Sequence, residues 1–185
     1  MTSFLGDAAS LIIQVVFGLY TLAVMLRLLF QLVRADFYNP VSQFLVALTN
    51  PLLRPLRRII PGLYGIDLAA VLLLLALKSL EIYLTQWIAG FSIAPITIVV
   101  VAVFKLLDLL LNVYLFAIFL RVILSWLNPQ GMRHNPAGDL LTSLTEPLLR
   151  RARRLLPPVG GLDLSPIAVL VIIQLVQLAL KHLLA

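Results

Sequence analysis

The sequence predicts an all-α membrane protein: four transmembrane helices in two parallel tandem repeats, each repeat with a cytoplasmic amphipathic helix. Of the 185 residues, 62% are hydrophobic and 12% are charged, whereas a soluble domain contains about 45–50% apolar residues. Four apolar stretches are each long enough to cross a bilayer core about 30 Å thick. An arginine-rich motif also occurs twice, which indicates a tandem duplication.

The duplicated motif defines the repeats. It reads NPLLRPLRRIIPGLYGID at residues 50–67 and EPLLRRARRLLPPVGGLD at residues 146–163, a spacing of 96 residues. We expect two domains, a first repeat at residues 1–93 and a second at residues 94–185, each with two spans and an amphipathic helix.

Length and composition predict the spans. The four predicted spans are residues 8–33, 68–88, 96–127 and 166–184. The first span lacks the basic start of a signal peptide, so we interpret it as an uncleaved anchor. Four spans place both termini on one side of the membrane, and two spans in each repeat give the repeats the same orientation.

The distribution of charge predicts the orientation. Both connections within a repeat are rich in arginine, whereas the connection between the repeats, residues 90–94, carries no charge. The positive-inside rule therefore places both arginine segments in the cytoplasm and both termini outside it.

Each arginine segment is predicted to begin a helix at a proline, Pro51 after Asn50 and Pro147 after Thr145 and Glu146. Proline lacks an N–H group and is tolerated in the first turn of a helix. At about 100° per residue, the arginines fall in one arc of each helix and leucines fall in another. These arginines are Arg54, Arg57, Arg58, Arg150, Arg151, Arg153 and Arg154.

An amphipathic helix of this kind can lie in the headgroup plane, with its leucines in the acyl boundary and its arginines on phosphates of anionic membrane lipids. The same arginines also suit docking of an acidic membrane or cytoplasmic protein partner. Direct nucleic-acid binding is not expected, although the net charge is +6, because the basic residues lie where the positive-inside rule requires them.

Two aspartates, Asp67 and Asp163, end the arginine segments and open the next spans. We expect them to cap these helices, since a carboxylate accepts hydrogen bonds from the free N–H groups at a helix start. The alternative is a salt bridge to an arginine of the adjacent segment, or to Arg27 or Arg121. Arg27 and Arg121 match each other at a spacing of 94 residues and are expected to anchor their spans by reaching the interface.

The second and third spans each carry an opposite-charge pair at i, i+3, Lys78 with Glu81 and Lys105 with Asp108. Unpaired charges at this depth are costly, and a hairpin turning near residue 93 brings Lys78 level with Asp108 and Glu81 level with Lys105. We expect a midplane polar layer in a four-helix bundle, serving as a structural clamp or, alternatively, as an ion or proton path. Its members are Gln14, Lys78, Glu81, Lys105, Asp108, Gln174 and Gln177.

The duplicated motif also resembles a known family. The pattern (N/E)-P-L-L-R-x-x-R-R-x-x-P followed by G-x-D, with an Asn-Pro step upstream at residues 39–40 and 135–136, is similar to the YggT family of bacterial inner-membrane proteins over nearly the whole chain. The fuller Gly-Leu-Asp-Leu-Ser-Pro ending stands only at residues 161–166, so a role of its Ser-Pro pair does not extend to the first copy. The resemblance implies a link to osmotic or potassium stress tolerance, or to cytochrome assembly and nucleoid or division organisation, as in plastid and cyanobacterial relatives.

These observations favour a membrane organising, assembly or osmotic stress-tolerance factor in the bacterial inner (plasma) membrane, with both termini periplasmic. The alternative is a small oligomeric ion channel or transporter subunit that uses the midplane charges, and a second copy of the chain is then a partner. An enzyme is not expected, because the two histidines, His134 and His182, lie near opposite membrane faces without a metal-ligand pattern. The sequence indicates neither a cofactor nor a metal site, and it contains no cysteine.

Overall fold

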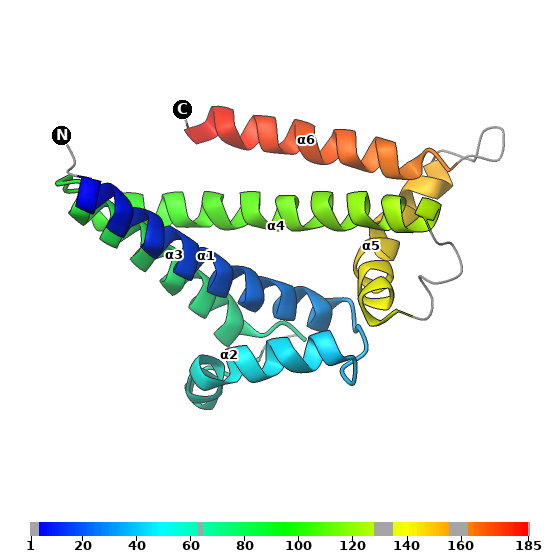
Figure 1. The fold of residues 1–185 in the computed structure, drawn as a ribbon, viewed down its shortest axis with the longest axis horizontal. Helices are drawn as coiled ribbons and strands as arrows, with labels where there is room; N and C mark the ends of the chain where they lie inside the picture. Colours follow the sequence, from blue (N-terminus) through cyan, green and yellow to red (C-terminus); the bar gives the residue numbers. More distant parts are fainter. Residues whose placement is uncertain (1–3, 63–64, 128–134, 156–162, 185) are drawn as a thin grey trace. The chain divides into compact units, whose positions relative to one another are not determined.

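The computed structural model describes residues 4–62, 65–127, 135–155 and 163–184, which form six helices (Figure 1). These described residues contain no β-strand, so the predicted all-helical architecture is confirmed. The helices are α1 (Phe4–Leu32), α2 (Pro40–Ile59), α3 (Leu68–Ile88), α4 (Pro95–Leu127), α5 (Pro136–Leu155) and α6 (Ser165–Leu184).

Four of these helices, α1, α3, α4 and α6, are long and apolar enough to cross a membrane. Their bounds agree with the predicted spans to within four residues, because a long apolar run in a bilayer must satisfy its backbone hydrogen bonds internally as a helix. Large apolar side chains on all four are exposed, among them Val16, Leu72, Phe116 and Ile172. Exposed apolar surface of this extent is expected of helices that face lipid.

The chain forms two compact units. The first contains residues 1–28 and 45–109, and the second contains residues 29–44 and 110–185. Each unit therefore includes residues on both sides of the predicted boundary between residues 93 and 94. That boundary concerns the duplication of the sequence and stays a prediction.

In the first unit, α2 lies across the later part of α1 and the start of α3 (Figure 1). Small side chains are buried on both spans, Ala23 and Val24 on α1 and Ala69 and Ala70 on α3. Small residues let helix backbones approach closely. Leu53 of α2 is also fully buried, so the arginine helix is anchored by its apolar side.

In the second unit, one apolar cluster joins three helices. It consists of Ile118 on α4, Leu149 on α5, and Val169 and Ile173 on α6, all buried. Figure 1 shows the corresponding arrangement, with α6 running alongside α4 and α5 lying across their ends. The cluster fixes α5 against the two spans, as Leu53 does for α2.

The predicted starts of the arginine helices are wrong. Pro51 and Pro147 lie inside helices that begin at Pro40 and Pro136, so each helix has about three more turns than expected. A proline in the first turn does mark the start of each helix, but the prolines that do so are Pro40 and Pro136, in the Asn-Pro steps upstream. Each helix therefore has a first half that contains no arginine.

The asparagines before Pro40 and Pro136 cap the two helices. Asn39 Oδ1 accepts a hydrogen bond from Val41 N at 3.0 Å, and Asn135 Oδ1 accepts one from Ala137 N at 3.0 Å. Asn39 is buried, and its Nδ2 also donates to the carbonyl oxygen of Pro136 at 2.7 Å. The starts of α2 and α5 therefore meet within the second unit.

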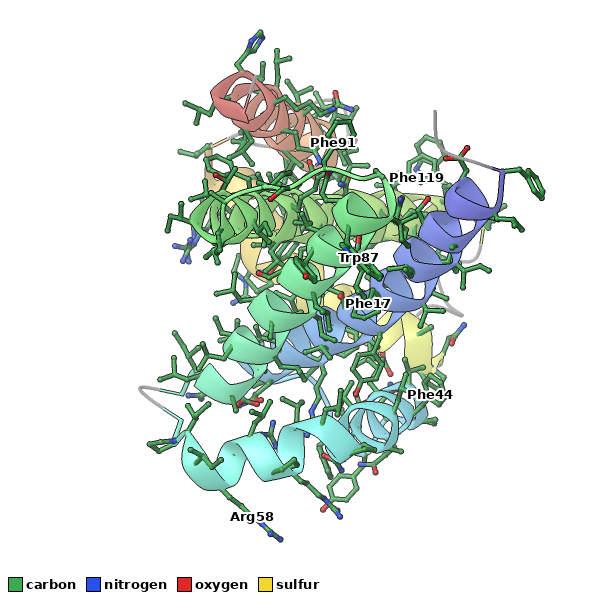
Figure 2. All side chains as sticks on the ribbon, turned by 90° about the vertical axis from the view of Figure 1, so that its left-hand side faces the viewer. Phe17, Phe44, Arg58, Trp87, Phe91 and Phe119 are labelled. Atoms are coloured by element: carbon green, nitrogen blue, oxygen red, sulfur yellow. The ribbon has the colours of Figure 1, made fainter. Side chains whose placement is uncertain are left out.

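Two prolines, Pro51 and Pro55, lie inside α2. Pro51 removes one helical hydrogen bond and bends the helix, and α2 changes direction along its length in both views (Figures 1 and 2). Carbonyl oxygens in the preceding turn accept side-chain donors from α1: Val46 O accepts from Arg27 Nη1 and Leu48 O from the Tyr20 hydroxyl, each at 3.4 Å. These two hydrogen bonds tie the turn before Pro51 to α1.

Candidate functional site

Each repeat contains an arginine cluster where its arginine helix meets the adjoining spans. The first cluster consists of Arg27, Thr49, Arg57 and Asp67. The second cluster consists of Arg121, Thr145, Glu146, Arg153 and Asp163. The first lies entirely in the first unit and the second entirely in the second.

A span arginine holds a helix threonine in both clusters. Arg27 Nη1 donates to Thr49 Oγ1 at 2.5 Å, and Arg121 Nη1 donates to Thr145 Oγ1 at 2.8 Å. Each threonine hydroxyl donates in turn to the carbonyl oxygen four residues earlier, at 2.6 Å for Thr49 and 2.7 Å for Thr145. The hydroxyl proton is thereby committed to the helix, and the oxygen lone pairs accept from arginine.

Sequence reasoning missed this contact. We expected Arg27 and Arg121 to anchor their spans at the interface, which stays a prediction, and the structure adds that both are partly buried and hydrogen-bonded to threonines. The threonine contact was missed because the predicted helices began after Thr49 or at Thr145, so neither threonine was placed inside a helix. The repeat register carried the missing signal, since both the arginine and the threonine recur in the second copy.

Glu146 gives the second cluster an additional anion. Its Oε2 accepts from Arg121 Nη2 at 2.7 Å, its Oε1 accepts from Arg153 Nη1 at 3.0 Å, and Arg150 Nε lies 3.8 Å from Oε1. Burial raises the pKa of Glu146, but the hydrogen bond from Arg121 and the nearby guanidinium charges outweigh it, so the pKa lies below the usual carboxyl value. The first repeat has Asn50 at the matching position.

Both roles that were alternatives for Asp67 occur together. Asp67 is the N-cap of α3, and its Oδ1 accepts from Ala70 N at 3.2 Å. Its Oδ2 accepts from Arg57 Nε at 3.0 Å and also from Arg57 Nη2. A charge-assisted contact of this kind ties the end of the arginine helix to the start of the next span.

Asp163 pairs with its arginine in the same way but does not hold the N-cap position. Its Oδ2 accepts from Arg153 Nε at 2.9 Å, whereas its Oδ1 accepts from Ser165 N at 2.9 Å and α6 begins only at Ser165. The residue that matches Ala70 is Pro166, which has no N–H to donate. The proline therefore explains why the carboxylate takes an earlier N–H and the helix starts later.

The remaining arginines of the two helices are exposed: Arg54, Arg58, Arg150, Arg151 and Arg154. Figure 2 shows Arg58 pointing away from the helices. Apolar residues at the ends of both helices are exposed beside them, with Ile59 80% and Leu155 82% accessible. Exposed arginine next to exposed aliphatic side chains suits the boundary between headgroups and acyl chains.

The midplane positions differ in their surroundings. Lys78 Nζ lies 2.6 Å from Glu81 Oε2 on the same helix, and each side chain is 13% exposed. In the second unit, Gln177 Nε2 donates to Asn112 Oδ1 at 2.9 Å, a contact between α6 and α4. Asn112 was not among the predicted members, although a lone amide in an apolar span is a visible signal.

Three further members of the predicted layer, Gln14, Lys105 and Gln174, are exposed, whereas Asp108 is partly buried. The predicted pairs Lys78 with Asp108 and Glu81 with Lys105 stay a prediction. Among the described residues, no three histidine, aspartate or glutamate side chains gather as metal ligands, and His134 lies outside the described residues.

The chain is similar to known proteins over nearly its whole length. A family model described as CCB3/YggT matches residues 7–88 and 100–184. The chain is 43% identical to an uncharacterised protein of Pseudomonas aeruginosa, over 94% of this chain and 88% of the relative. It is 36% identical to an uncharacterised protein of Vibrio alginolyticus, over 91% and 90%, and 33% identical to the uncharacterised protein YggT of Escherichia coli K12, over 96% and 92%. No solved structure matches the chain.

Proposed function

The chain belongs to the CCB3/YggT family, and we propose that it is a membrane organising, assembly or osmotic stress-tolerance factor of the bacterial inner membrane. Its two arginine helices bind phospholipid headgroups or a protein partner at the cytoplasmic face. One observation carries the proposal. One arginine in each helix is paired with an aspartate of the chain, and the others are exposed beside apolar side chains.

The topology follows from the positive-inside rule. Four spans place both arginine helices on the same side, and their charge makes that side the cytoplasm. The two repeats then have the same orientation, with both termini in the periplasm. Each helix turns an apolar side toward its own unit, through Leu53 and Leu149, and its exposed arginines toward the lipid and the cytoplasm.

The exposed charges are sufficient for a preference among lipids. A basic side chain near an anionic leaflet contributes about 1 kcal/mol, and five arginines of α2 and α5 are exposed in addition to the paired Arg57. The paired arginines, Arg57 and Arg153, also hold each helix against its span. The proposal assigns the chain no catalytic activity.

Growth under osmotic stress tests the proposal. In a strain without its own copy of the gene, a variant with glutamine at the five exposed arginines, Arg54, Arg58, Arg150, Arg151 and Arg154, is expected to lose tolerance of high osmolarity. The matched control exchanges Lys78 and Glu81, which keeps their i, i+3 ion pair, and is expected to grow as the wild type does. Membrane levels of each variant are measured by immunoblot.

The second candidate is a small oligomeric ion channel or transporter subunit. Lys105 favours it, because this lysine is exposed in the apolar span α4, and no ion pair to it is found among the described residues. A charge exposed at this depth is costly unless a water-filled path or another chain faces it. The channel candidate predicts the reverse growth result, with the exchange harmful and the arginine variant tolerated.

Ion flux separates the two candidates directly. Potassium and proton flux are measured in proteoliposomes with the wild type and with the double variant Glu81→Gln, Lys105→Gln, which leaves the summed charge unchanged. Our proposal expects no flux above empty liposomes, with insertion and folding verified by protease protection. Wild-type flux that the double variant removes would replace our proposal with the channel.

A further inference from the structure

The two arginine clusters differ by one carboxylate. The matching members are Arg27 with Arg121, Thr49 with Thr145, Arg57 with Arg153, and Asp67 with Asp163. Glu146 has no acidic counterpart, because Asn50 occupies its position. The first cluster therefore has two guanidinium groups and one carboxylate, whereas the second has two of each and is balanced.

The guanidinium atoms that hold Glu146 have unused counterparts in the first repeat. Arg121 donates to Glu146 through Nη2, and Arg153 donates to it through Nη1. Within the described part of the chain, Arg27 donates through Nη1 alone, to neutral oxygens, and Arg57 donates to Asp67 through Nε and Nη2. Among the described residues, Arg27 Nη2 and Arg57 Nη1 have no acceptor.

Glu146 shows which charges surround an anion at this place. Its carboxylate lies 2.7 Å from Arg121, 3.0 Å from Arg153 and 3.8 Å from Arg150. The matching arginines in the first repeat are Arg27, Arg57 and Arg54. Since the threonine contact is the same in both copies, an anion beside Asn50 is expected to meet the same three guanidinium groups.

The position of Arg27 along its span favours a phospholipid as the source of this anion. Arg27 lies five residues before the end of α1, which is about 8 Å of helix. A long side chain at this depth reaches the phosphate level of the membrane. Soluble phosphate would have to enter the headgroup layer, whereas a phospholipid phosphate already lies there with one negative charge.

We propose that the first repeat binds the phosphate of one phospholipid at Arg27, Arg54 and Arg57, in the place that the Glu146 carboxylate occupies in the second repeat. The bound phosphate restores the charge balance that the first cluster lacks. This site rests on the proposed lipid contact of the arginine helices, and it adds one defined position and a difference between the repeats.

Exchange of the two residues between the repeats tests the site. Native mass spectrometry counts the phosphatidylglycerol molecules that the protein retains after extraction from phosphatidylglycerol membranes. Asn50→Glu brings the carboxylate of the second repeat into the first, and retention is expected to fall at least about tenfold, since like charges repel at a desolvated guanidinium site. Asn50→Gln, which matches glutamate in size but is neutral, is the control and is expected to retain the lipid.

The reciprocal variant gives a gain of binding. Glu146→Asn vacates the place beside Arg121, and the protein is expected to retain one more phosphatidylglycerol than the wild type. Equal retention by wild type, Asn50→Glu and Asn50→Gln, with unchanged unfolding temperatures, overturns the proposal. It does so without touching the proposed function, because growth of the five-arginine variant is a separate measurement.

A last experiment distinguishes binding of a lipid phosphate from binding of free phosphate. Inorganic phosphate is titrated into delipidated protein in a neutral detergent, and the unfolding temperature is followed. We expect no saturable rise, in contrast to added phosphatidylglycerol. A saturable rise with inorganic phosphate that Asn50→Glu removes, without lipid retention, would overturn the lipid as the ligand.

Discussion

Asp67 combines two contacts in one carboxylate, because Oδ1 caps α3 and Oδ2 pairs with Arg57. Its side chain is 6% exposed, whereas that of Asp163 is 43% exposed. We expect Asp67→Ala to lower the free energy of unfolding by about 1–2 kcal/mol, the cost of a lost N-cap, and Asp163→Ala to lower it less. Unfolding in mixed SDS and nonionic micelles, followed by circular dichroism, measures both. Equal losses would contradict the assignment.

Glu146 and Asp163 make the second repeat sensitive to acid. Burial raises the pKa of each, but hydrogen bonds and charges from neighbouring groups outweigh it, so both folded-state pKa values lie below the usual range. Their stabilisation is complete above the unfolded-state values of about 4, and it is lost as the pH falls through the lower folded-state values.

The corresponding measurement is the unfolding temperature as a function of pH. We expect the wild-type value to fall on acidification below about pH 4, and the fall to be shallower in Glu146→Gln, which cannot titrate at this position. Asn50→Gln, at the matching position of the first repeat, is the control and should follow the wild type. A Glu146→Gln profile parallel to that of the wild type would argue against stabilisation by this carboxylate.

The side chains divide into those whose roles the sequence could predict and those it could not. A carboxylate next to a helix start and an arginine segment has few partners, so both roles of Asp67 were foreseen. The sequence also contained the reason why Asp163 does not hold the N-cap position, because Pro166 has no N–H to donate to it. The bonds of Arg27 and Arg121 were not, because they depend on where α2 and α5 cross the spans.

Among the helices, the apolar spans were predicted closely and the arginine helices were not. A long apolar span can only form a helix, since its backbone N–H and C=O groups must hydrogen-bond to each other within the hydrocarbon. The arginine helices offered two Asn-Pro or Glu-Pro signals each, and proline fits the first turn of a helix equally well at either. Only the packing of Leu45, Thr49 and Leu53, all buried, places the first half of α2 in the same helix as its arginines.

The caps of the arginine helices lead to a comparison between the repeats. Asn39 and Asn135 each cap a helix, but Asn39 also donates to the carbonyl of Pro136 from a buried position. We expect Asn39→Ala to destabilise the protein by about 1 kcal/mol more than Asn135→Ala, since a further hydrogen bond, donated from a buried position, is lost. Chemical unfolding of both variants tests this, and a larger effect at Asn135 would be inconsistent with the link between α2 and α5.

For the whole chain, the duplication was visible in the sequence, but the compact units were not. The motif repeats at a constant spacing of 96 residues, whereas the first unit combines most of one repeat with the first half of α4. This difference has a physical origin: α4 is a single helix of 33 residues, and its two halves have different neighbours. The spacing of the motif reflects the duplication of the sequence, whereas the packing of a long helix depends on its neighbours in the fold.

The absence of cysteine makes the predicted orientation directly testable. Ser92, in the connection between α3 and α4, and Ser125, near the end of α4, are both exposed and predicted to lie on opposite sides of the membrane. We expect Ser92→Cys to react with a membrane-impermeant maleimide in intact cells, and Ser125→Cys to react only after permeabilisation, because the arginine-rich side should face the cytoplasm. The cysteine-free wild type controls for background labelling. The opposite pattern would place the arginine helices in the periplasm, away from the anionic cytoplasmic leaflet that the proposed lipid contact requires.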